Sequence, residues 1–332
     1  MINPDAKLNA KVFADDIEKT PVRNGFGTGI VEAGKADPRV VVLCADLAES
    51  TRAESFKKIF PERFIEMGVA EQNMATVAAG MAAAGKIPFI TSYAVFSPGR
   101  NYEQIRTTIA LNKMSVKICG MHAGVSVGAD GATHQMLEDI GMMRTLPGMA
   151  VIVPCDAEEA RKAVIVAAKT DGPVYIRFGR SATPVFTTSE TPFQIGKSLT
   201  LWDSNPSAGG PKVAILSTGS LSYAALAAAN ELSKNGVESI VLHISTIKPL
   251  DEEAVLNAAK RAGRIVTVEE HQVAGGFGSA IAEFLSETYP VPIKRIGVLD
   301  QFGQSGSPEE LLAHYGLDAL HIADTIRAFV LI

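Results

Sequence analysis

Short runs of Val and Ile alternate with longer Ala-rich segments along almost the whole chain, and this alternation limits the possible folds more than any other feature. The Val and Ile runs have the length of buried strands, and the segments between them have the periodicity of helices. Parallel strands joined by crossover helices give this pattern, because helices then cover both faces of the sheet. The sequence therefore predicts an α/β fold with parallel sheets.

The same pattern places the individual elements. In the first part of the chain, strands are expected near Val40–Cys44, Phe64–Met67, Pro88–Thr91, Val116–Cys119, Met149–Val153 and Val174–Arg177. Helices are expected there at Ala70–Ala84, Asn101–Asn112 and Ala157–Lys169. In the second part, strands are expected near Val213–Ser217, Glu238–His243, Arg264–Glu269 and Ile293–Gly297. Helices are expected there at Ser220–Lys234, Glu252–Ala259, Gly278–Thr288, Pro308–His314 and in the tail Ala319–Ile332.

Two domains are expected, because 332 residues are more than one hydrophobic core usually serves. Ser, Thr, Pro, Gly and Asn accumulate between Arg180 and Pro211, which marks the candidate boundary. The prediction is a first domain at 1–190, a linker at 191–211 and a smaller α/β domain at 212–332.

Composition and charge exclude several classes of protein. An apolar fraction of 47% with 20% charged residues fits a soluble globular protein, and no apolar stretch is long enough to cross a membrane. The first residues lack the basic start and apolar centre of a secretory signal, so a cytoplasmic protein is expected. A net charge of −5 without basic runs argues against nucleic acid binding. Cys44, Cys119 and Cys155 have no paired spacing, and buried reduced thiols are expected.

The segment Gly68–Met74 is the first candidate site, because it runs from a strand end into a helix. Ligands of open α/β sheets gather at such edges. It contains Glu71, but a glutamate in a first helical turn also complements the helix dipole without any further function. On spacing alone the dipole explanation is the default.

The segment His122–Gln135 is the second candidate site and follows an apolar strand. It places His122, Asp130 and His134 among three glycines, which let the backbone come close to a ligand. A metal site and a plain loop are the competing interpretations. The two histidines are twelve residues apart, with only Asp130 as a local third ligand, so substrate handling is favoured.

Two arginines and two missing motifs complete the set of candidates. Arg23 opens the first helix and Arg180 follows a strand, where arginines suit phosphate or carboxylate capture. The segment Gly276–Ile281 departs from a dinucleotide fingerprint at its last small residue, and there is no Gly-Lys-Ser/Thr phosphate loop. An NAD enzyme or a nucleotide hydrolase is therefore disfavoured.

Taken together, these motifs resemble the transketolase family, from its pyrimidine-binding domain to its C-terminal domain. Gly68–Met74 matches the family segment that holds the cofactor-activating glutamate, and Asp130–Gln135 matches a second signature in residue type and order. Glu269–His271 followed by Gly275–Gly278 looks like the C-terminal domain's pattern. The resemblance covers nearly the whole chain.

One part of the family has no counterpart in this sequence. The N-terminal module, whose Gly-Asp-Gly and downstream Asn hold a divalent metal and the cofactor's diphosphate, is missing. The resemblance is therefore to split transketolases, in which that module is a separate chain. It implies a partner subunit that holds Mg²⁺ or Ca²⁺, a chain that is inert alone, no metal site in this chain, and a heterotetramer with two copies of each chain.

The resemblance also implies how thiamine diphosphate is used. In the family, the cofactor's 4′-amino group removes the proton from the thiazolium C2, and Glu71 would enable this by a hydrogen bond to N1′ of the pyrimidine. That role requires a carboxyl that shares or holds a proton, which burial against an apolar wall would promote. Phe96 matches the aromatic residue packed on the pyrimidine, Tyr93 lies where another aromatic is frequent, and Asp46 falls near the cofactor.

Substrate roles follow from the same resemblance. A ketose phosphate would lose a two-carbon ketol unit, which passes to an aldose phosphate. By motif position, His134 would contact the donor's first hydroxyls and Asp130 the acceptor's C2 hydroxyl. The positions that hold the substrate phosphate are Arg23, Ser50, His122 and Arg180.

Three alternatives share the fold. A 1-deoxyxylulose-5-phosphate synthase usually lacks a histidine like His122 and is one longer chain. The β subunits of 2-oxo-acid dehydrogenases share the glutamate but lack the full Asp130–His134 signature. A non-catalytic assembly subunit would not require Glu71 and Phe96 together with these residues. The pentose phosphates of the pentose phosphate pathway are the default substrates, since the sequence does not identify the sugar.

Overall fold

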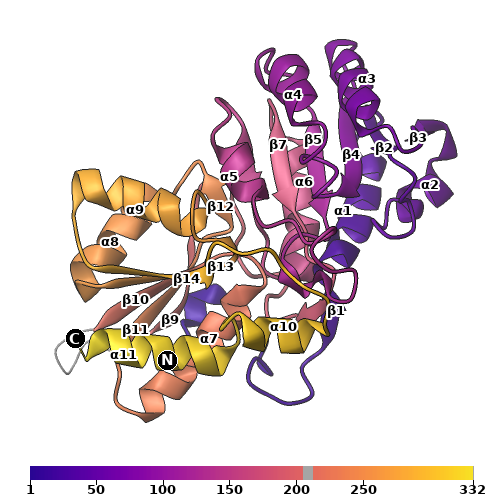
Figure 1. Ribbon diagram of the computed structural model, residues 1–332. Coiled ribbons are helices and arrows are strands. Elements are labelled where there is room, and N and C mark those ends of the chain that lie inside the picture. Colours follow the sequence, from indigo (N-terminus) through magenta and orange to yellow (C-terminus); the bar gives the residue numbers. More distant parts are fainter. Residues whose placement is uncertain (205–211, 332) are drawn as a thin grey trace.

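The computed structural model describes residues 1–204 and 212–331 and contains two main sheets (Figure 1). The larger sheet has seven strands in the order β12-β6-β7-β5-β4-β2-β3. The smaller sheet has five strands in the order β14-β13-β10-β11-β9. Helices pack on both, so the predicted two-domain α/β class is confirmed.

The larger sheet is parallel except at one edge. Its parallel strands are β2 (Val40–Cys44), β3 (Phe64–Glu66), β4 (Ile87–Tyr93), β5 (Lys117–Met121), β6 (Ala150–Ile152) and β7 (Val174–Arg177). Each lies within two residues of its expected position at both ends. The edge strand β12 (Thr246–Lys248) is antiparallel to β6.

Alternate side chains of β2 show why this sheet is covered on both faces. Val40, Val42 and Cys44 pack against helices α1 (Val22–Ala36) and α6 (Ala157–Ala168). Val41 and Leu43 pack on the opposite face. That face is covered by α3 (Glu71–Ala83), the π-helix η3 (Ile105–Ala110) and α5 (Asp139–Arg144).

The smaller sheet has the same layered construction. Its strands are β9 (Leu199–Asp203), β10 (Val213–Ser217), β11 (Ser239–His243), β13 (Ile265–Gln272) and β14 (Ile293–Val298). Helices α8 (Glu252–Ala262) and α9 (Phe277–Thr288) cover one face, and α7 (Leu221–Lys234) and α11 (Ala319–Val330) cover the other. Asp251 caps the start of α8 and Gly263, at φ +66°, ends it, so local sequence fixes both ends.

Short elements fill the connections. They are η1 (Pro4–Ala6), β1 (Lys19–Pro21), α2 (Glu54–Ile59), η2 (Pro61–Arg63), α4 (Tyr102–Gln104), η4 (Val125–Val127), β8 (Ala182–Pro184) and α10 (Pro308–His314). The helix expected at Asn101–Asn112 is therefore realised as one short α turn followed by a π-helix.

The expected linker is corrected by β9. This strand falls inside 191–211, yet it pairs antiparallel with β11 as an edge of the smaller sheet. On its other side β9 contacts the N-terminal residues of the chain: Ile2 forms a β-bridge with Trp202, and Asn3 N–H donates to Leu201 O at 2.9 Å. The first residues thus pack with the second domain rather than the first (Figure 1), and 205–211 lie outside the described residues.

The two sheets share one hydrophobic core. Ile140 and Met143 of α5 belong to the same buried cluster as Ala214 of β10 and Phe277 of α9. Buried polar groups also cross the junction, since His243 Nε2 at the end of β11 lies 2.8 Å from Glu159 Oε2 on α6. Within the described residues, no helix is long and apolar enough to span a membrane.

Candidate functional site

The sequence-predicted residues gather at one edge of the larger sheet. Strands β7, β5, β4, β2 and β3 are neighbours in that order and run parallel. Arg180, His122, Tyr93, Asp46 and Glu71 follow or end these strands, one each. The carboxyl ends of parallel strands meet at one edge, where ligands of α/β sheets bind.

Glu71 is the first residue of α3 and is only 2% exposed. Its Oε2 accepts a 2.8 Å hydrogen bond from Nη1 of Arg100, and Ser92 Oγ lies 3.5 Å from Oε1. Asn101 Nδ2 donates to the backbone oxygen of Glu71 at 3.0 Å, which fixes the helix start. The carboxylate thus meets a cation and a hydroxyl rather than the apolar wall expected from the sequence.

Four rings form a cluster that reaches Arg100 through Phe96. The rings of Phe96 and Tyr93 are stacked with centroids 6.0 Å apart, and Tyr93 stacks on His122 at 3.9 Å. His134 meets both aromatic residues edge-on, at 5.6 Å from Phe96 and 6.0 Å from Tyr93. The guanidinium of Arg100 lies 4.8 Å above the Phe96 ring. Phe96 therefore links the carboxylate side of the site to the two histidines.

His122 is buried and neutral. Its Nε2 lies 2.9 Å from Nη1 of Arg23, and because a guanidinium can only donate, this nitrogen must be an acceptor. Burial, followed by the charges of Arg23 and Arg180, lowers the pKa of His122 to about 3. The proton therefore resides on Nδ1, which is buried without a hydrogen-bond partner among the described residues.

Three arginines surround this imidazole. Besides His122, Arg23 donates to the backbone oxygen of Ser50 at 2.9 Å, so Ser50 contributes its carbonyl here. Arg180 Nη1 donates to Val127 O at 2.5 Å. Burial and then the charges of Arg52 and Arg180 lower the pKa of Arg23. Like charges held together in this way are typical of a site for an anion.

Backbone strain is concentrated at the same edge. His122, Asp46 and Arg52 have φ values of +56°, +58° and +67°, a region that residues other than glycine rarely adopt. Each follows one of the central strands. Non-glycine residues held in this conformation cluster at functional sites, because the surrounding structure must stabilise them.

Two predicted residues remain apart from this group. Asp46 is exposed, and its backbone N–H donates to Glu66 Oε1 at 2.7 Å. Asp130 is also exposed, and its backbone oxygen accepts from Thr133 Oγ1 at 3.5 Å. Neither carboxylate forms a hydrogen bond or ion pair with the other candidate residues. The neighbouring His134 is oriented through its Nδ1, which lies 2.9 Å from Thr133 Oγ1, so its Nε2 is the ring nitrogen not used in this contact.

Sequence reasoning missed Arg100 and Arg52. Arg100 lies four residues after Phe96, and Arg52 lies two residues after Ser50. A basic residue close to an identified aromatic or phosphate position was the available signal. Neither position is distinctive without the fold, because most arginines are solvated.

The residues fit the pyrimidine end of thiamine diphosphate. A planar N–H-bearing group, the Arg100 guanidinium, already lies between the Glu71 carboxylate and the Phe96 ring. An aminopyrimidine has the same planar shape and donor capacity. Among the described residues, the group of side chains that could hold a metal is Cys155, Glu159 and His243, far in sequence from the predicted loop and already mutually bonded.

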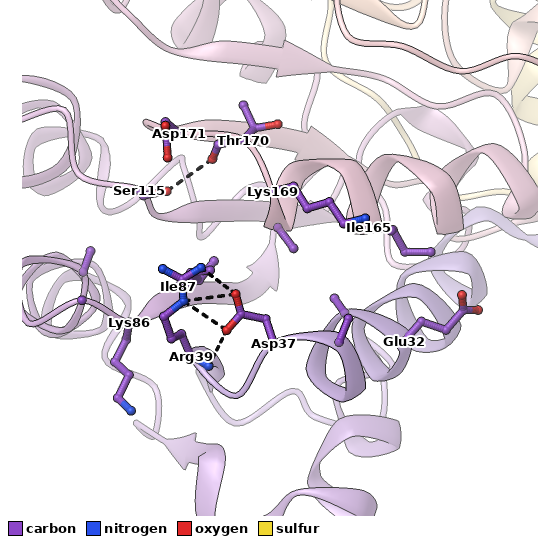
Figure 2. A pocket seen from close by; sticks show the side chains of 15 residues that line it. Glu32, Asp37, Arg39, Lys86, Ile87, Ser115, Ile165, Lys169, Thr170 and Asp171 are labelled. Atoms are coloured by element: carbon purple, nitrogen blue, oxygen red, sulfur yellow. Dashed lines mark hydrogen bonds and ion pairs between the residues drawn. The ribbon is translucent and has the colours of Figure 1, made fainter.

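A cavity of about 590 Å³ lies at the opposite edge of the same sheet (Figure 2). Its lining includes Arg39, Ile87 and Ser115, which precede or begin β2, β4 and β5. Within this lining, Arg39 forms a bidentate pair with Asp37. None of the sequence-predicted site residues lines it.

Comparison with known proteins agrees with this geometry. Residues 18–185 match the family described as transketolase, pyrimidine binding domain, and residues 204–322 match transketolase, C-terminal domain. One subunit of an apulose-4-phosphate transketolase from Phocaeicola vulgatus is 40% identical over 93% of this chain and 97% of its own length. The 6-deoxy-6-sulfo-D-fructose transketolase subunit SqwH from Clostridium sp. (strain MSTE9) is 39% identical over 93% of this chain and 94% of its own length.

A solved structure is similar over the same range. It is described as a split gene transketolase in an inactive β4 tetramer, and it is 44% identical with a TM-score of 0.85. The match covers 93% of this chain and 97% of that chain. The similarity therefore extends over both sheets and does not stop at the linker.

Proposed function

We infer that this chain, which belongs to the transketolase family, is the subunit of a split transketolase that carries the pyrimidine-binding half of the active site. The reaction would be the transfer of a two-carbon ketol unit from a ketose phosphate to an aldose phosphate. The observation that carries this proposal is the unbroken series of contacts from Glu71 through Arg100, Phe96 and Tyr93 to His122, with His134 against both aromatic rings. It combines a buried carboxylate, an aromatic platform and a cationic pocket in one place.

Glu71, Phe96, Tyr93 and Asp46 are the proposed cofactor residues. Thiamine diphosphate, when bound, supplies a carbon nucleophile that cleaves the bond next to a ketose carbonyl. Glu71 would form the hydrogen bond to the pyrimidine N1′, because its carboxyl is buried and Asn101 fixes its backbone at the helix start. Phe96 would stack on the ring, and Tyr93 would support Phe96 from the other side.

The remaining residues are proposed to hold the substrates. Arg23, Arg180 and the Nδ1 proton of His122 would bind the substrate phosphate, with Ser50 at its edge. His134 would direct its Nε2 to the donor's hydroxyls. Asp130 would accept a hydrogen bond from the acceptor sugar, a role that its exposure permits.

In this proposal, a partner subunit supplies the remaining part of the active site. An N-terminal subunit would hold the cofactor's diphosphate and a Mg²⁺ or Ca²⁺ ion, in a cytoplasmic heterotetramer with two copies of each chain. Support comes from the subunit designations of two relatives and from the description of the solved structure as a split gene product. The names of those relatives include a sugar phosphate and a sulfonated sugar, so pentose phosphates are one candidate substrate class among anionic sugars.

Reconstitution tests the proposal directly. This chain is mixed with its candidate partner, thiamine diphosphate, Mg²⁺, xylulose 5-phosphate and ribose 5-phosphate, and sedoheptulose 7-phosphate is measured. Apulose 4-phosphate and 6-deoxy-6-sulfo-D-fructose are then offered as donors. Condensation of pyruvate with glyceraldehyde 3-phosphate would instead identify a synthase, and a tight complex without any turnover would identify an assembly subunit.

Glu71→Ala separates catalysis from assembly. We expect turnover to fall by at least about a thousandfold, since the hydrogen bond to the pyrimidine N1′ is lost, while binding of the partner subunit is unchanged. Glu252→Ala is the matched control, because Glu252 is also a first-turn glutamate, on α8, but is exposed. Equal activity in the two variants would refute the cofactor role. Glu71 would then be explained as a first-turn carboxylate that complements the helix dipole.

A further inference from the structure

The loop that carries both site histidines is held from outside its own domain. Gln135 Nε2 donates to Gln304 O at 3.0 Å, and to Val125 O and Gly128 O within the loop. Gly131 packs so closely on Ser305 that an added Cβ would lie 2.6 Å from its Oγ. The segment that follows β14 therefore covers one side of the loop.

Glu270 of β13 holds the middle of the same loop. Its side chain is 4% exposed, and its Oε1 accepts a 2.6 Å hydrogen bond from the backbone N–H of Ser126. Oε2 accepts from Ser220 Oγ at 3.3 Å. Both oxygens are thus engaged, and Ser126 lies between His122 and His134 in the sequence.

Gly124 allows this approach. Its φ is +93°, and a Cβ added there would lie 2.3 Å from Glu270 Oε1. Only glycine adopts that conformation without strain and leaves the space for a carboxylate. Two independent features, a short hydrogen bond and a glycine-sized gap, therefore place Glu270 against the loop.

Glu270 is itself fixed by the first domain. Arg177 Nη2 donates to the backbone oxygen of Glu270 at 2.8 Å, and Arg177 Nε is paired with Asp139 Oδ2 at 2.8 Å. The carboxylate that supports the loop therefore has little freedom to move with it. A fixed supporting group restricts a loop more than a flexible one does.

We propose that Glu270 is a positioning residue, which holds the loop between His122 and His134 in the conformation that receives the substrate. The proposal rests on the function inferred above for the two histidines. It gives the second domain a role in catalysis, although no residue of that domain is among the proposed catalytic or binding residues. Glu270 would act only through the backbone of Ser126.

Hydrogen exchange of the isolated chain tests the contact without any turnover. In Glu270→Ala, we expect amide exchange in residues 124–128 to rise about tenfold or more, as follows from the loss of one charged hydrogen bond. Glu270→Gln keeps an oxygen acceptor and should restore most of the protection. Glu269→Gln is the matched control, because Glu269 is also buried on the same strand but accepts from Phe277 and Gly278 of α9.

Steady-state kinetics of the reconstituted complex test the consequence. Glu270→Ala should raise KM for the ketose phosphate by roughly tenfold, since a displaced loop misplaces substrate contacts, and Glu270→Gln should return KM towards the wild-type value. The affinity for thiamine diphosphate, measured by calorimetry, should not change. Gly124→Ala should reproduce the higher KM, because the added methyl group would collide with Glu270 and push the loop away from it.

The outcomes distinguish this inference from the proposed function. A wild-type complex that turns over no sugar refutes the function, while the exchange measurement still decides whether Glu270 holds the loop. Unchanged exchange in Glu270→Ala overturns the inference, whatever the activity. Faster exchange with unchanged KM in an active complex also overturns it, because Glu270 would then stabilise the fold without positioning the substrate loop.

Discussion

At the residue scale, His122 shows how a side chain can be both buried and ready for a ligand. Its Nε2 is engaged by Arg23, and its Nδ1 has no partner among the described residues. A buried donor without a partner costs stability, about 1–3 kcal/mol in proteins. A bound anion that accepts a hydrogen bond from Nδ1 would recover this lost stability. This is the expected behaviour of a binding site rather than of a core.

The low pKa of His122 predicts a pH dependence of stability. Its folded pKa of about 3 lies below the ordinary value of 6.5, so below pH 6.5 the unfolded chain takes up a proton that the folded chain refuses. Stability should therefore fall on acidification from pH 6.5 towards pH 3, at about 1.4 kcal/mol per pH unit from this group. In His122→Gln, which keeps an acceptor for Arg23, the loss between pH 7 and pH 5 should be smaller by about 2 kcal/mol.

Urea unfolding at pH 7 and pH 5 measures this difference. His314→Gln is the control, because His314 is exposed on α10 and should leave the pH dependence as in the wild type. The same acid sensitivity in His122→Gln and the wild type would show that His122 is not the group responsible.

Motif order predicts most of the residues that the fold brings together at this edge of the sheet. Glu71, Phe96, His122 and His134 lie in recognisable segments. Arg100 could not be predicted in its role, since its contact with Glu71 depends on how the turn after β4 folds back on α3. Motifs identify residue types, whereas the contacts between those residues depend on the fold.

At the element scale, α1 fixes the position of Arg23 through glycines. A Cβ on Gly25 would lie 2.0 Å from Ala157 O, and one on Gly29 would lie 2.7 Å from Arg161 O. Helices α1 and α6 are therefore in backbone contact at two points one turn apart. Arg23 lies two residues before the first of them, so its place over the sheet edge depends on this contact.

Gly25→Ala should separate the two helices. The added methyl group has no space, so we expect a loss of stability of about 1–3 kcal/mol, as for other overpacked positions. Gly80→Ala is the matched control: Gly80 is also in a helix, α3, with nothing within 4 Å of an added Cβ. It should gain up to about 1 kcal/mol from better helix propensity. Urea unfolding measures the free energy of unfolding of both variants. The same change in Gly25→Ala and Gly80→Ala would refute the close contact between α1 and α6.

Elements with strong periodicity were predictable, and those defined by pairing were not. The central parallel strands are continuous apolar runs and lie where the sequence placed them. Strands β9 and β12 were not predicted, and both are antiparallel edge strands that take their partners from β11 and β6. Such a strand is specified by the neighbour it pairs with as much as by its own residues.

At the scale of the whole molecule, the two domains are joined by a buried contact between Glu159 and His243. Burial alone would raise the pKa of Glu159, but the charge and hydrogen bond of His243 leave it below its usual value. Ser222 Oγ lies 2.7 Å from the other ring nitrogen, so the histidine is held on both sides. This contact ties α6 of the first domain to β11 of the second.

Glu159→Ala should weaken both domains together. Removing one partner of a buried pair leaves the other without compensation, which costs about 3–5 kcal/mol. Because one core spans both sheets, unfolding should remain a single transition. Fluorescence of Trp202, in β9, should therefore report the same midpoint as circular dichroism of the whole chain.

Glu158→Ala is the control, because Glu158 pairs with Arg161 at the surface of the same helix and should cost less than about 1 kcal/mol. Two separate transitions in Glu159→Ala, with only one shifted, would contradict a shared core. The domain count could be predicted from chain length, but this degree of coupling could not, since it depends on side chains from distant segments.

The contact between Arg100 and Glu71 has a consequence for how such a subunit exists before it meets its partner. A carboxylate sealed at a helix start needs a counter-ion, and this chain brings its own on a neighbouring turn. Arg100 therefore occupies the position next to the Glu71 carboxylate, while about half of its own side chain remains in solvent. The cofactor's pyrimidine and Arg100 would compete for the Glu71 carboxylate. Cofactor binding would therefore displace Arg100 instead of adding a ligand to an unpaired charge.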